Sequence, residues 1–457
     1  MQHKTKLNLF DFTMIMVSFV IGMGIFRTPV NAAQATTSEW MFFAVWIAGG
    51  FVAICGALTY AEIGSRFPVT GGYYRIFAHA YHPSIGFGVN CIILVSNAAS
   101  MAAVALVGAE YISAIAFPHL ENLQTVHIIV AITCILLFYV VNLLGLKMSA
   151  KAQTVLTLVK ILMVLLLISP IFFVEELPAS VKQASLVTES NPLLMEYIKA
   201  FGLGLVAVSF TFGGYQQVIN FGEEVKNPSK NIPRAIFFGL LIIISLYLLI
   251  NYAYIRIIGF EELKTSKNIS AILAEHVFGD AAGKIISILL FLSVLAYVNV
   301  VLLSNPRVMQ AMSEERVLPR AFAKRTQQKD VLFVSLTVFA ALGALIVFWA
   351  ETFDEILSFT IFLDCFGMAL SAATIFFFRK KTKHLDHTGI YKMKLYPLLP
   401  IIFITVYVFV AVSIFIDKPY TALTGIGILA LFIGIYFLIK KAKYFEDPIG
   451  RKENIEL

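Results

Sequence analysis

Twelve long apolar segments follow one another along this 457-residue chain, separated by short polar stretches. They lie at about 10–33, 39–65, 84–117, 125–146, 153–174, 197–221, 233–258, 281–312, 331–349, 354–378, 396–416 and 421–440. Each is close to the roughly 20 apolar residues that an α-helix needs to cross a bilayer. The segments are continuously apolar rather than alternating, which excludes a transmembrane β-barrel. The sequence therefore predicts an all-α integral membrane protein with about twelve transmembrane helices.

The composition agrees with a bilayer as the solvent for most of the chain. Apolar residues make up 59% and charged residues 14%, whereas soluble domains average roughly 45–50% and about 25%. A soluble enzyme, a disordered chain and a disulfide scaffold are excluded. The four cysteines lie within apolar segments and form no CxxC pair, so we interpret them as buried apolar side chains. We expect no metal site and no cofactor.

Basic residues gather at the termini and in alternate connections between the spans. An even number of spans places both termini on one side, and most of the 35 Lys and Arg residues then fall on that side. Because cytoplasmic loops of membrane proteins are rich in Lys and Arg, we predict that both termini are cytoplasmic. The same rule accounts for the formal charge of +7 without a nucleic-acid partner. The first apolar segment is too long for a signal sequence and lacks a small-residue cleavage site, so we expect it to remain as the first helix.

Glycines interrupt the first and the sixth apolar segments. The first contains Gly22-Met23-Gly24, and the sixth contains Gly213-Gly214. Glycine costs about 1 kcal/mol relative to alanine inside a helix, so two close glycines mark a place where a helix can unwind. The alternative is that these glycines only let neighbouring helices pack closely.

The two interruptions occupy corresponding positions if the chain consists of two repeats of five spans each, followed by two further spans. We predict one transmembrane domain over 1–457, with a first repeat at 10–174, an inverted second repeat at 197–379 and two additional helices at 396–440. Interrupted segments at matching places in two halves indicate an inverted-repeat transporter. Unwound backbone offers N–H groups to a carboxylate and C=O groups to an ammonium, which a free amino acid presents together.

Four motifs in order along the chain resemble the amino acid–polyamine–organocation (APC) superfamily, and within it the L-type amino acid transporter-like permeases. They are GMGIF at 22–26, YAEIG at 60–64 with FP at 67–68 and GGY at 71–73, GEEVKNP at 222–228 with IPRAI at 232–236, and RV at 307–308 with AM at 311–312 and LP at 318–319. The resemblance covers nearly the whole chain. It implies a LeuT-type five-plus-five inverted repeat in which broken helices 1 and 6 enclose the substrate.

The resemblance also implies a set of site residues. The backbone N–H groups of Met23, Gly24 and Ile25 are expected to receive the substrate carboxylate. The carbonyls of Val20, Phe210 and Gly213 are expected to receive its ammonium, with the Phe210 side chain as an aromatic gate. Met23 departs from the Ser, Thr or Ala that is usual in the family, so a hydroxyl contact is missing there. The predicted substrate-binding residues are Val20, Gly22, Met23, Gly24, Ile25, Phe210, Phe212, Gly213, Gln216 and Asp364.

Several charged residues lie inside apolar segments. Lys160 is about nine residues, or ~13 Å, into the fifth span, too deep for easy snorkelling. It resembles the family's fifth-helix lysine, whose ammonium takes the place of sodium in related sodium-coupled transporters, and we predict that it serves proton coupling. Family members with such a lysine include exchangers, so exchange stays open. Asp364 is expected to bind a polar or cationic substrate group, accept a proton or pair with a buried group. For Glu110 and Arg27, an ion pair in a vestibule and a position at the outer interface remain alternatives.

We predict a secondary active transporter that moves neutral L-amino acids across a bacterial inner or plasma membrane by alternating access, either proton-coupled or by exchange. The alternatives are a transporter of cationic or polar amino acids or polyamines, suggested by Asp364, and a membrane amino acid sensor that does not transport. Motifs for a nucleophile, zinc or a P-loop lysine are absent, so we expect no enzyme. Eukaryotic light chains of this type attach to a heavy chain through a cysteine between spans 3 and 4. Residues 117–124 contain no cysteine, and no disulfide-linked heavy chain is expected.

Overall fold

The chain folds almost entirely into helices. The computed structural model describes residues 7–22, 24–69, 71–117, 119–120, 123–174, 194–266, 268–326, 329–349, 353–381 and 390–441. Among these residues, β pairing is limited to one isolated parallel bridge between Leu7 and Val225. The all-α class predicted from the sequence is confirmed.

The long helices follow the predicted apolar segments in order. They are α1 (Leu9–Val20) with α2 (Gly24–Ala35), α3 (Glu39–Arg66), α5 (Pro83–Ala116), α6 (Gln124–Leu143), α7 (Leu146–Ile168), α9 (Leu194–Phe212), α10 (Pro228–Ile257), α13 (Asp280–Glu314), α14 (Phe333–Trp349), α15 (Phe353–Lys381), α16 (Leu398–Asp417) and α17 (Pro419–Lys441). Shorter elements are α4 (Gly72–Ala80), α11 (Phe260–Thr265), α12 (Ile269–Phe278) and the 3₁₀ helices η1 (Ser169–Phe172), η2 (Tyr215–Asn220), η3 (Gly222–Glu224) and η4 (Arg320–Ala323).

Ten helices in the described part of the chain are long and apolar enough to cross a membrane, with α1 and α2 taken as one. The other two predicted spans correspond to α9, with 19 residues, and α14, with 17 residues, which are not among these ten. The protein is thus a multi-pass membrane protein. The total of twelve spans and the inverted repeat remain predictions.

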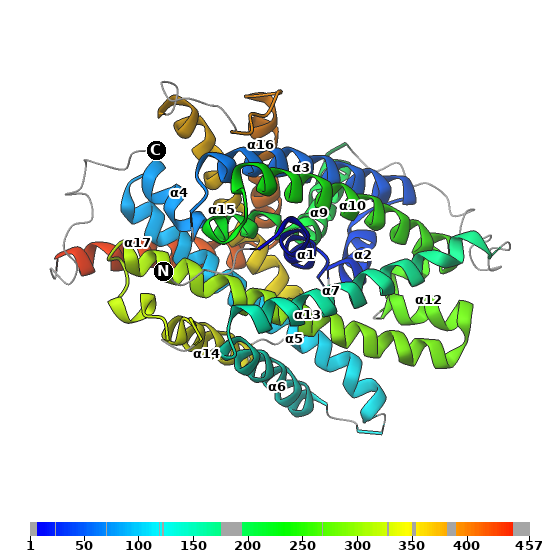
Figure 1. The fold of residues 1–457 in the computed structure, drawn as a ribbon. Helices are drawn as coiled ribbons and strands as arrows, with labels where there is room; N and C mark the ends of the chain where they lie inside the picture. Colours follow the sequence, from blue (N-terminus) through cyan, green and yellow to red (C-terminus); the bar gives the residue numbers. More distant parts are fainter. Residues whose placement is uncertain are drawn as a thin grey trace.

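The helices differ in how deeply they are buried. The long helices α3, α10 and α13 run in roughly the same direction, with α1 and α2 among them (Figure 1). In the apolar window of Leu9–Ala35, 71% of residues are buried, and for α5 the share is 78%. For α17 it is only 17%. The interrupted first span therefore lies in the centre of the bundle and α17 at its periphery.

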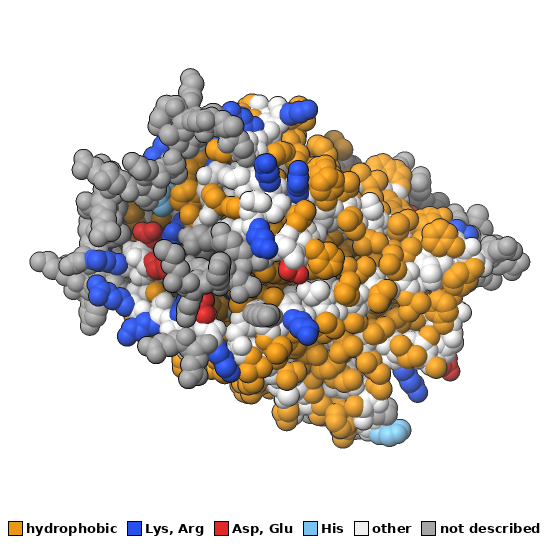
Figure 2. Space-filling model, viewed as in Figure 1, with side chains coloured by type: hydrophobic (Ala, Val, Ile, Leu, Met, Phe, Trp, Pro, Cys, Tyr) orange, Lys and Arg blue, Asp and Glu red, His pale blue; other side chains and the backbone are white. Residues whose placement is uncertain are grey.

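The surface is divided between an apolar area and a basic area. On the face shown in Figure 2, hydrophobic side chains cover the centre and the right side. Most of the visible Lys and Arg side chains lie toward the left, the side on which Figure 1 shows α4 and α17. Large apolar side chains such as Leu162, which is 66% exposed, point away from the protein. This division of the surface suits a protein that crosses a bilayer.

Two predicted connections contain helices. Residues 66–83 mix aromatic and basic side chains, from which the sequence predicts an interfacial segment with a short amphipathic helix, and α4 confirms the helix. Scattered charge at 259–280 predicts a surface connection there, but α11 and α12 occupy this stretch and pack into the core, so that prediction is wrong. Their buried residues Phe260 with Leu263, and Ile269 with Leu273, have the three- and four-residue spacing of a helix face. The other long connection predicted from the sequence, near 175–196, lies mostly at residues 175–193, which are outside the described residues.

A buried carboxylate joins α3 to the C-terminal end of α15. The Glu62 side chain is fully buried, and its oxygens accept hydrogen bonds from Arg66 Nε at 2.8 Å and from Arg379 Nε and Nη2 at 2.8 and 2.7 Å. The backbone N–H of Met393 donates to the same carboxylate at 2.9 Å. Glu224 pairs similarly with Arg307 at 3.1 Å. Glu62 and Glu224 therefore each have a structural role as the carboxylate of an ion pair with arginine.

Replacing Glu62 with glutamine is expected to destabilise the protein strongly. The change keeps the side-chain size but leaves two largely buried guanidinium groups without their carboxylate, a loss worth about 3–5 kcal/mol. The matched control is Glu261→Gln, which breaks an exposed pair with Lys264 and should cost less than about 1 kcal/mol. Thermal unfolding in detergent compares the two. Equal unfolding temperatures for the two variants would contradict this assignment.

Candidate functional site

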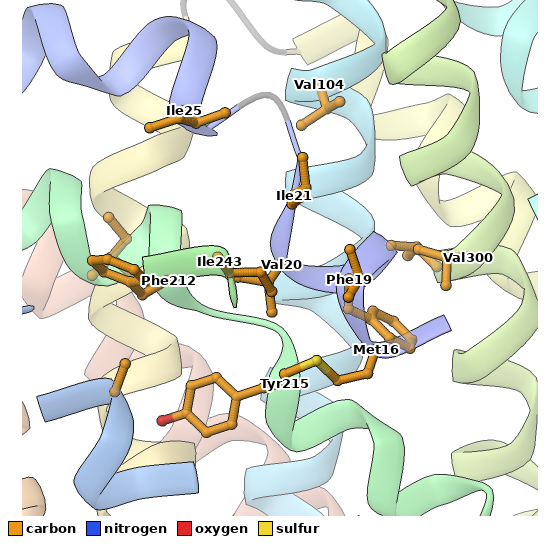
Figure 3. Packing of buried hydrophobic residues seen from close by; sticks show 14 of the residues in the cluster. Met16, Phe19, Val20, Ile21, Ile25, Val104, Phe212, Tyr215, Ile243 and Val300 are labelled. Carbon is orange, nitrogen blue, oxygen red and sulfur yellow. The ribbon is translucent and has the colours of Figure 1, made fainter. Parts of the chain in front are cut away.

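The first transmembrane segment is interrupted where the sequence predicts it. Helix α1 ends at Val20, and Ile21 leaves the helical region with ψ of 79°. The N–H of Gly22 donates to the Val20 carbonyl at 2.8 Å, a tight turn in place of a helical bond. Helix α2 then begins at Gly24. Figure 3 shows the extended chain at Ile21 between the two helices. Met23 lies outside the described residues.

The second interruption separates α9 from η2. Helix α9 ends at Phe212, Gly213 and Gly214 form a turn, and η2 starts at Tyr215. Gly214 has φ of +108°, a conformation that side chains with a Cβ disfavour. Its N–H donates to Gln216 Oε1 at 2.9 Å, which replaces a helical acceptor by a side chain. The chain between Phe212 and Tyr215 in Figure 3 is accordingly not helical.

The glycines of each interruption pack against the other one. A Cβ on Gly24 would lie 3.0 Å from the Cα of Thr211, and a Cβ on Gly214 would lie 2.6 Å from the carbonyl oxygen of Phe19. Thr211, which Gly24 contacts, is also hydrogen-bonded through its hydroxyl to the hydroxyl of Thr28 in α2. Unwinding and close packing, the two alternatives from the sequence, therefore occur together at these glycines.

A cavity lies between the two interruptions. Six of the predicted site residues line it, namely Val20, Gly22, Gly24, Gly213, Gln216 and Asp364. The other described lining residues are Phe19, Asn97, Ser100, Val104, Ser209, Thr211, Gly214, Gln217, Tyr297, Val301, Asn305, Ile361, Met368 and Tyr407. The cavity is thus bordered by backbone from both interruptions and by a mixture of polar and apolar side chains, among which Asp364 is the single charged one in the described part of the chain.

Two other predicted site residues, Ile25 and Phe212, are not among the described residues that line this cavity. The Ile25 side chain is fully buried in the core. Phe212 packs against Trp46 and Tyr247, with ring centroids 5.8 and 5.2 Å apart. The Phe210 side chain lies outside what the structure describes, although its backbone belongs to α9.

Two carbonyls at the first interruption already accept hydrogen bonds from side chains. The Tyr247 hydroxyl of α10 donates to the Val20 carbonyl at 2.7 Å. The Lys160 ammonium of α7 donates to the Ile21 carbonyl at 2.7 Å. Lys160 is fully buried, which agrees with the depth expected from its place in the sequence. The sequence analysis missed Tyr247, since nothing in the local sequence shows which tyrosine reaches a distant carbonyl.

A chain of buried polar side chains extends from Lys160 toward α6. The Lys160 ammonium lies 3.5 Å from Ser18 Oγ, which also accepts from the Gln153 amide. Gln153 Oε1 accepts from Asn299 Nδ2 at 2.7 Å, and Asn299 Oδ1 accepts from Asn142 Nδ2 at 2.9 Å. The sequence contained a signal for this chain, because each of the three amides interrupts an apolar segment. Buried amides in a bilayer need such mutual bonds.

The other charged residues inside apolar segments have identified partners. Asp364 Oδ1 accepts from Ser96 Oγ at 2.7 Å at the border of the cavity. Arg27 and Glu110 form an ion pair, with Arg27 Nη1 3.8 Å from Glu110 Oε2 and the Glu110 side chain 43% exposed. The side chains of this pair are 19% and 43% exposed, whereas Lys160 is fully buried.

An all-helical membrane protein whose two interrupted helices meet at a polar cavity has the features of a small-molecule transporter. A sequence model of the amino acid permease family matches residues 7–438, and the chain belongs to this family. It is therefore a transporter and not an enzyme.

Several characterised relatives are similar over nearly their whole length. The serine/threonine exchanger SteT of Bacillus subtilis is 29% identical over 443 residues, which cover 95% of this chain and 96% of SteT. The human large neutral amino acids transporter small subunit 2 is 26% identical, with 98% of this chain and 83% of the relative covered. The human cystine/glutamate transporter is also 26% identical, with 97% and 88% covered. These relatives and the family support amino acid transport by exchange or symport.

Replacing Gly214 with alanine is expected to disable transport. Alanine at φ of +108° costs about 1–3 kcal/mol, and its Cβ would collide with the Phe19 carbonyl. If this cost raises the free energy of one conformation of the transport cycle relative to the others, uptake drops roughly 5- to 150-fold. Uptake of radiolabelled amino acid into proteoliposomes measures the change. The control is Gly427→Ala in α17, where an added Cβ meets no atom within 4 Å. Equal uptake by the two variants would refute the requirement for glycine.

Proposed function

We propose that this protein carries neutral L-amino acids across a bacterial cytoplasmic membrane by alternating access, with both termini in the cytoplasm. The observation that carries the proposal is that the backbone of both helix interruptions borders one internal cavity. The excess of Lys and Arg at the termini and in the alternate connections of the sequence supports the orientation. The similarity to SteT along 96% of its length supports a bacterial membrane.

The carboxylate of the substrate is proposed to bind at the start of α2. The first N–H groups of a helix have no partner inside the helix, and the helix dipole favours an anion there. Gly24 opens α2 and lines the cavity, so its N–H is the best-placed donor. Met23 and Ile25 are the flanking donors of the prediction. Only their backbone N–H groups are required, which is consistent with the Ile25 side chain packing in the core.

The ammonium of the substrate is proposed to bind the carbonyls of Phe210 and Gly213 at the second interruption. The Val20 carbonyl was the third predicted acceptor, but it already accepts from the Tyr247 hydroxyl and from the N–H of Gly22. A carbonyl oxygen has two lone pairs. We therefore assign Val20 a secondary role, in which the ammonium displaces one of these two donors.

Neutral side chains are favoured because the cavity lining is nearly free of formal charge. Among the described lining residues, Asp364 is the single carboxylate, and it is already bonded to Ser96. A cationic amino acid is the second candidate, with Asp364 as its partner. Polyamines fit less well, because they lack the carboxylate that the start of α2 would bind. The absence of cysteine at 117–124 supports function without a disulfide-linked heavy chain.

Lys160 is proposed to couple transport to its driving reaction. Its ammonium holds the Ile21 carbonyl next to the substrate cavity. If the group loses its proton, it loses charge and donor strength, and the first interruption loses a support. In a proton-coupled cycle this loss accompanies the change of access. In an exchanger the same hydrogen bond stays formed and supports the unwound chain during both inward and outward movement of substrate.

Lys160→Ala is expected to abolish the stimulation of uptake by an imposed inward proton gradient, and to lower uptake at least about tenfold. The matched control is Lys151→Ala, which removes an exposed lysine from the same helix. The assay compares proteoliposomes with a pH gradient and proteoliposomes preloaded with amino acid. If Lys160→Ala retains full and equally pH-dependent uptake, Lys160 does not have this role.

Recognition of both charged ends predicts a pattern of competition. The methyl ester of a transported amino acid lacks the carboxylate, and its decarboxylated amine lacks it as well. Losing a charge-assisted hydrogen bond costs about 1.5–3 kcal/mol, so both compounds should compete roughly 10- to 150-fold more weakly than the free amino acid. Inhibition of radiolabelled uptake measures this. Equal inhibition by the ester would rule out a carboxylate site at α2.

Asp364→Asn separates the two substrate classes. If the substrate is neutral, the variant keeps uptake within about threefold, because asparagine retains an acceptor for Ser96. If cationic amino acids are carried, their uptake falls at least about tenfold. Uptake of one neutral and one cationic amino acid by the same variant distinguishes the outcomes.

A further inference from the structure

A second hollow shares none of its described lining residues with the substrate cavity. It is a groove of about 460 Å³ between α3, the first turns of α10 and the segment that precedes α16. The side chains that matter for its chemistry are Ser229, Lys230, Arg234, Phe237, Phe238 and Tyr391. It is therefore basic at one end of α10 and aromatic further along that helix.

Hydrogen bonds fix the walls of this groove to one another. Ser65 Oγ on α3 donates to the Ser229 carbonyl of α10 at 3.0 Å. The same oxygen accepts from the N–H of Tyr391 at 2.9 Å. Two residues further on, Met393 is bonded to the buried carboxylate of Glu62. One hydroxyl and one carboxylate of α3 thus hydrogen-bond to α10 and to the segment before α16. These bonds fix the positions of the residues on either side of the groove.

The basic end of the groove has two positive charges on one helix face. Lys230 and Arg234 are four residues apart, a spacing that places their side chains next to each other. Both are exposed, and in the part of the chain that the structure describes no ion pair involves either of them. Like charges at this spacing repel. An anion between them would offset that repulsion.

The other end of the groove is apolar and open. Phe237 and Phe238 are 38% and 57% exposed. Phe238 lies eight residues beyond Lys230, which is ~12 Å along the helix axis. Helix α10 is one of the helices that can cross a membrane. On the face shown in Figure 2, Lys and Arg side chains also border hydrophobic surface. An occupant that uses the whole groove has an anionic head and an apolar tail.

We propose that this groove binds one anionic phospholipid, with its phosphate between Lys230 and Arg234 and an acyl chain along Phe237 and Phe238. Charge complementarity favours an anionic lipid over a zwitterionic one. The Tyr391 hydroxyl is a further donor to the phosphate. Burial, followed by the charge of nearby Glu62, raises the pKa of Tyr391, so this hydroxyl keeps its proton. The inference does not depend on which amino acid is transported.

The test uses the purified full-length protein, stripped of lipid in a neutral detergent. Phosphatidylglycerol, phosphatidylcholine, inorganic phosphate and glycerol 3-phosphate are added separately. Native mass spectrometry counts bound lipid, and thermal unfolding measures stabilisation. We expect phosphatidylglycerol to bind saturably at one high-affinity site per chain and to raise the unfolding temperature. The two water-soluble phosphates and phosphatidylcholine should produce little change at the same concentrations.

Charge-matched variants assign the binding to the groove. Lys230→Gln combined with Arg234→Gln should weaken phosphatidylglycerol binding at least about tenfold. The control is Arg320→Gln with Lys324→Gln, which removes two exposed basic residues at and just after η4, outside the groove. Phe238→Ser should weaken lipid binding without removing charge. Unfolding temperatures without lipid verify that all variants fold.

Three results would overturn the proposal. In the first, the groove variant and the control lose affinity equally, which indicates a diffuse charge effect. In the second, inorganic phosphate stabilises as well as the lipid, which indicates an anion site without an acyl-chain contact. In the third, phosphatidylcholine binds as tightly as phosphatidylglycerol, which indicates an apolar contact alone.

Discussion

Backbone polar groups cannot be left without hydrogen-bond partners in the apolar interior of a bilayer. Two interrupted helices bring such groups to the centre of this bundle, and much of the surrounding structure supplies their partners. Tyr247 bonds the Val20 carbonyl, Lys160 bonds the Ile21 carbonyl, and Gln216 accepts from the N–H of Gly214. These side chains come from α10, α7 and η2, so the interruptions depend on the tertiary structure that surrounds them.

The interruptions also require each other. Glycine at position 214 lets the chain leave the helix, and glycine at positions 24 and 214 lets the two segments approach to within contact distance. A larger residue at either place would push the segments apart and alter the cavity between them. The polar chain from Ser18 through Gln153 to Asn299 then ties the first interruption to α7 and α13. Asn142 extends the chain to α6. Movement of α1 during transport would therefore strain contacts with α6, α7 and α13, and we regard this chain as part of the support for Lys160.

Local features of the sequence predicted the local features of the site. Each pair of glycines marked an interruption, and the run of apolar residues around Lys160 indicated its depth. Long-range partners could not be predicted, because no local pattern shows that Tyr247 reaches Val20 or that Asn299 reaches Gln153. The direction of a side chain near an interruption was equally inaccessible. Phe212 is adjacent to Gly213, yet its ring packs against Trp46 instead of lining the cavity.

The most direct measurement is an experimental structure of the protein in lipid with a transported neutral amino acid bound. The account predicts that the carboxylate lies within hydrogen-bond distance, about 2.7–3.2 Å, of the N–H of Gly24 at the start of α2. It places the ammonium at the carbonyls of Phe210 and Gly213. An amino acid bound outside the cavity, or bound there with its ammonium toward α2, would contradict it.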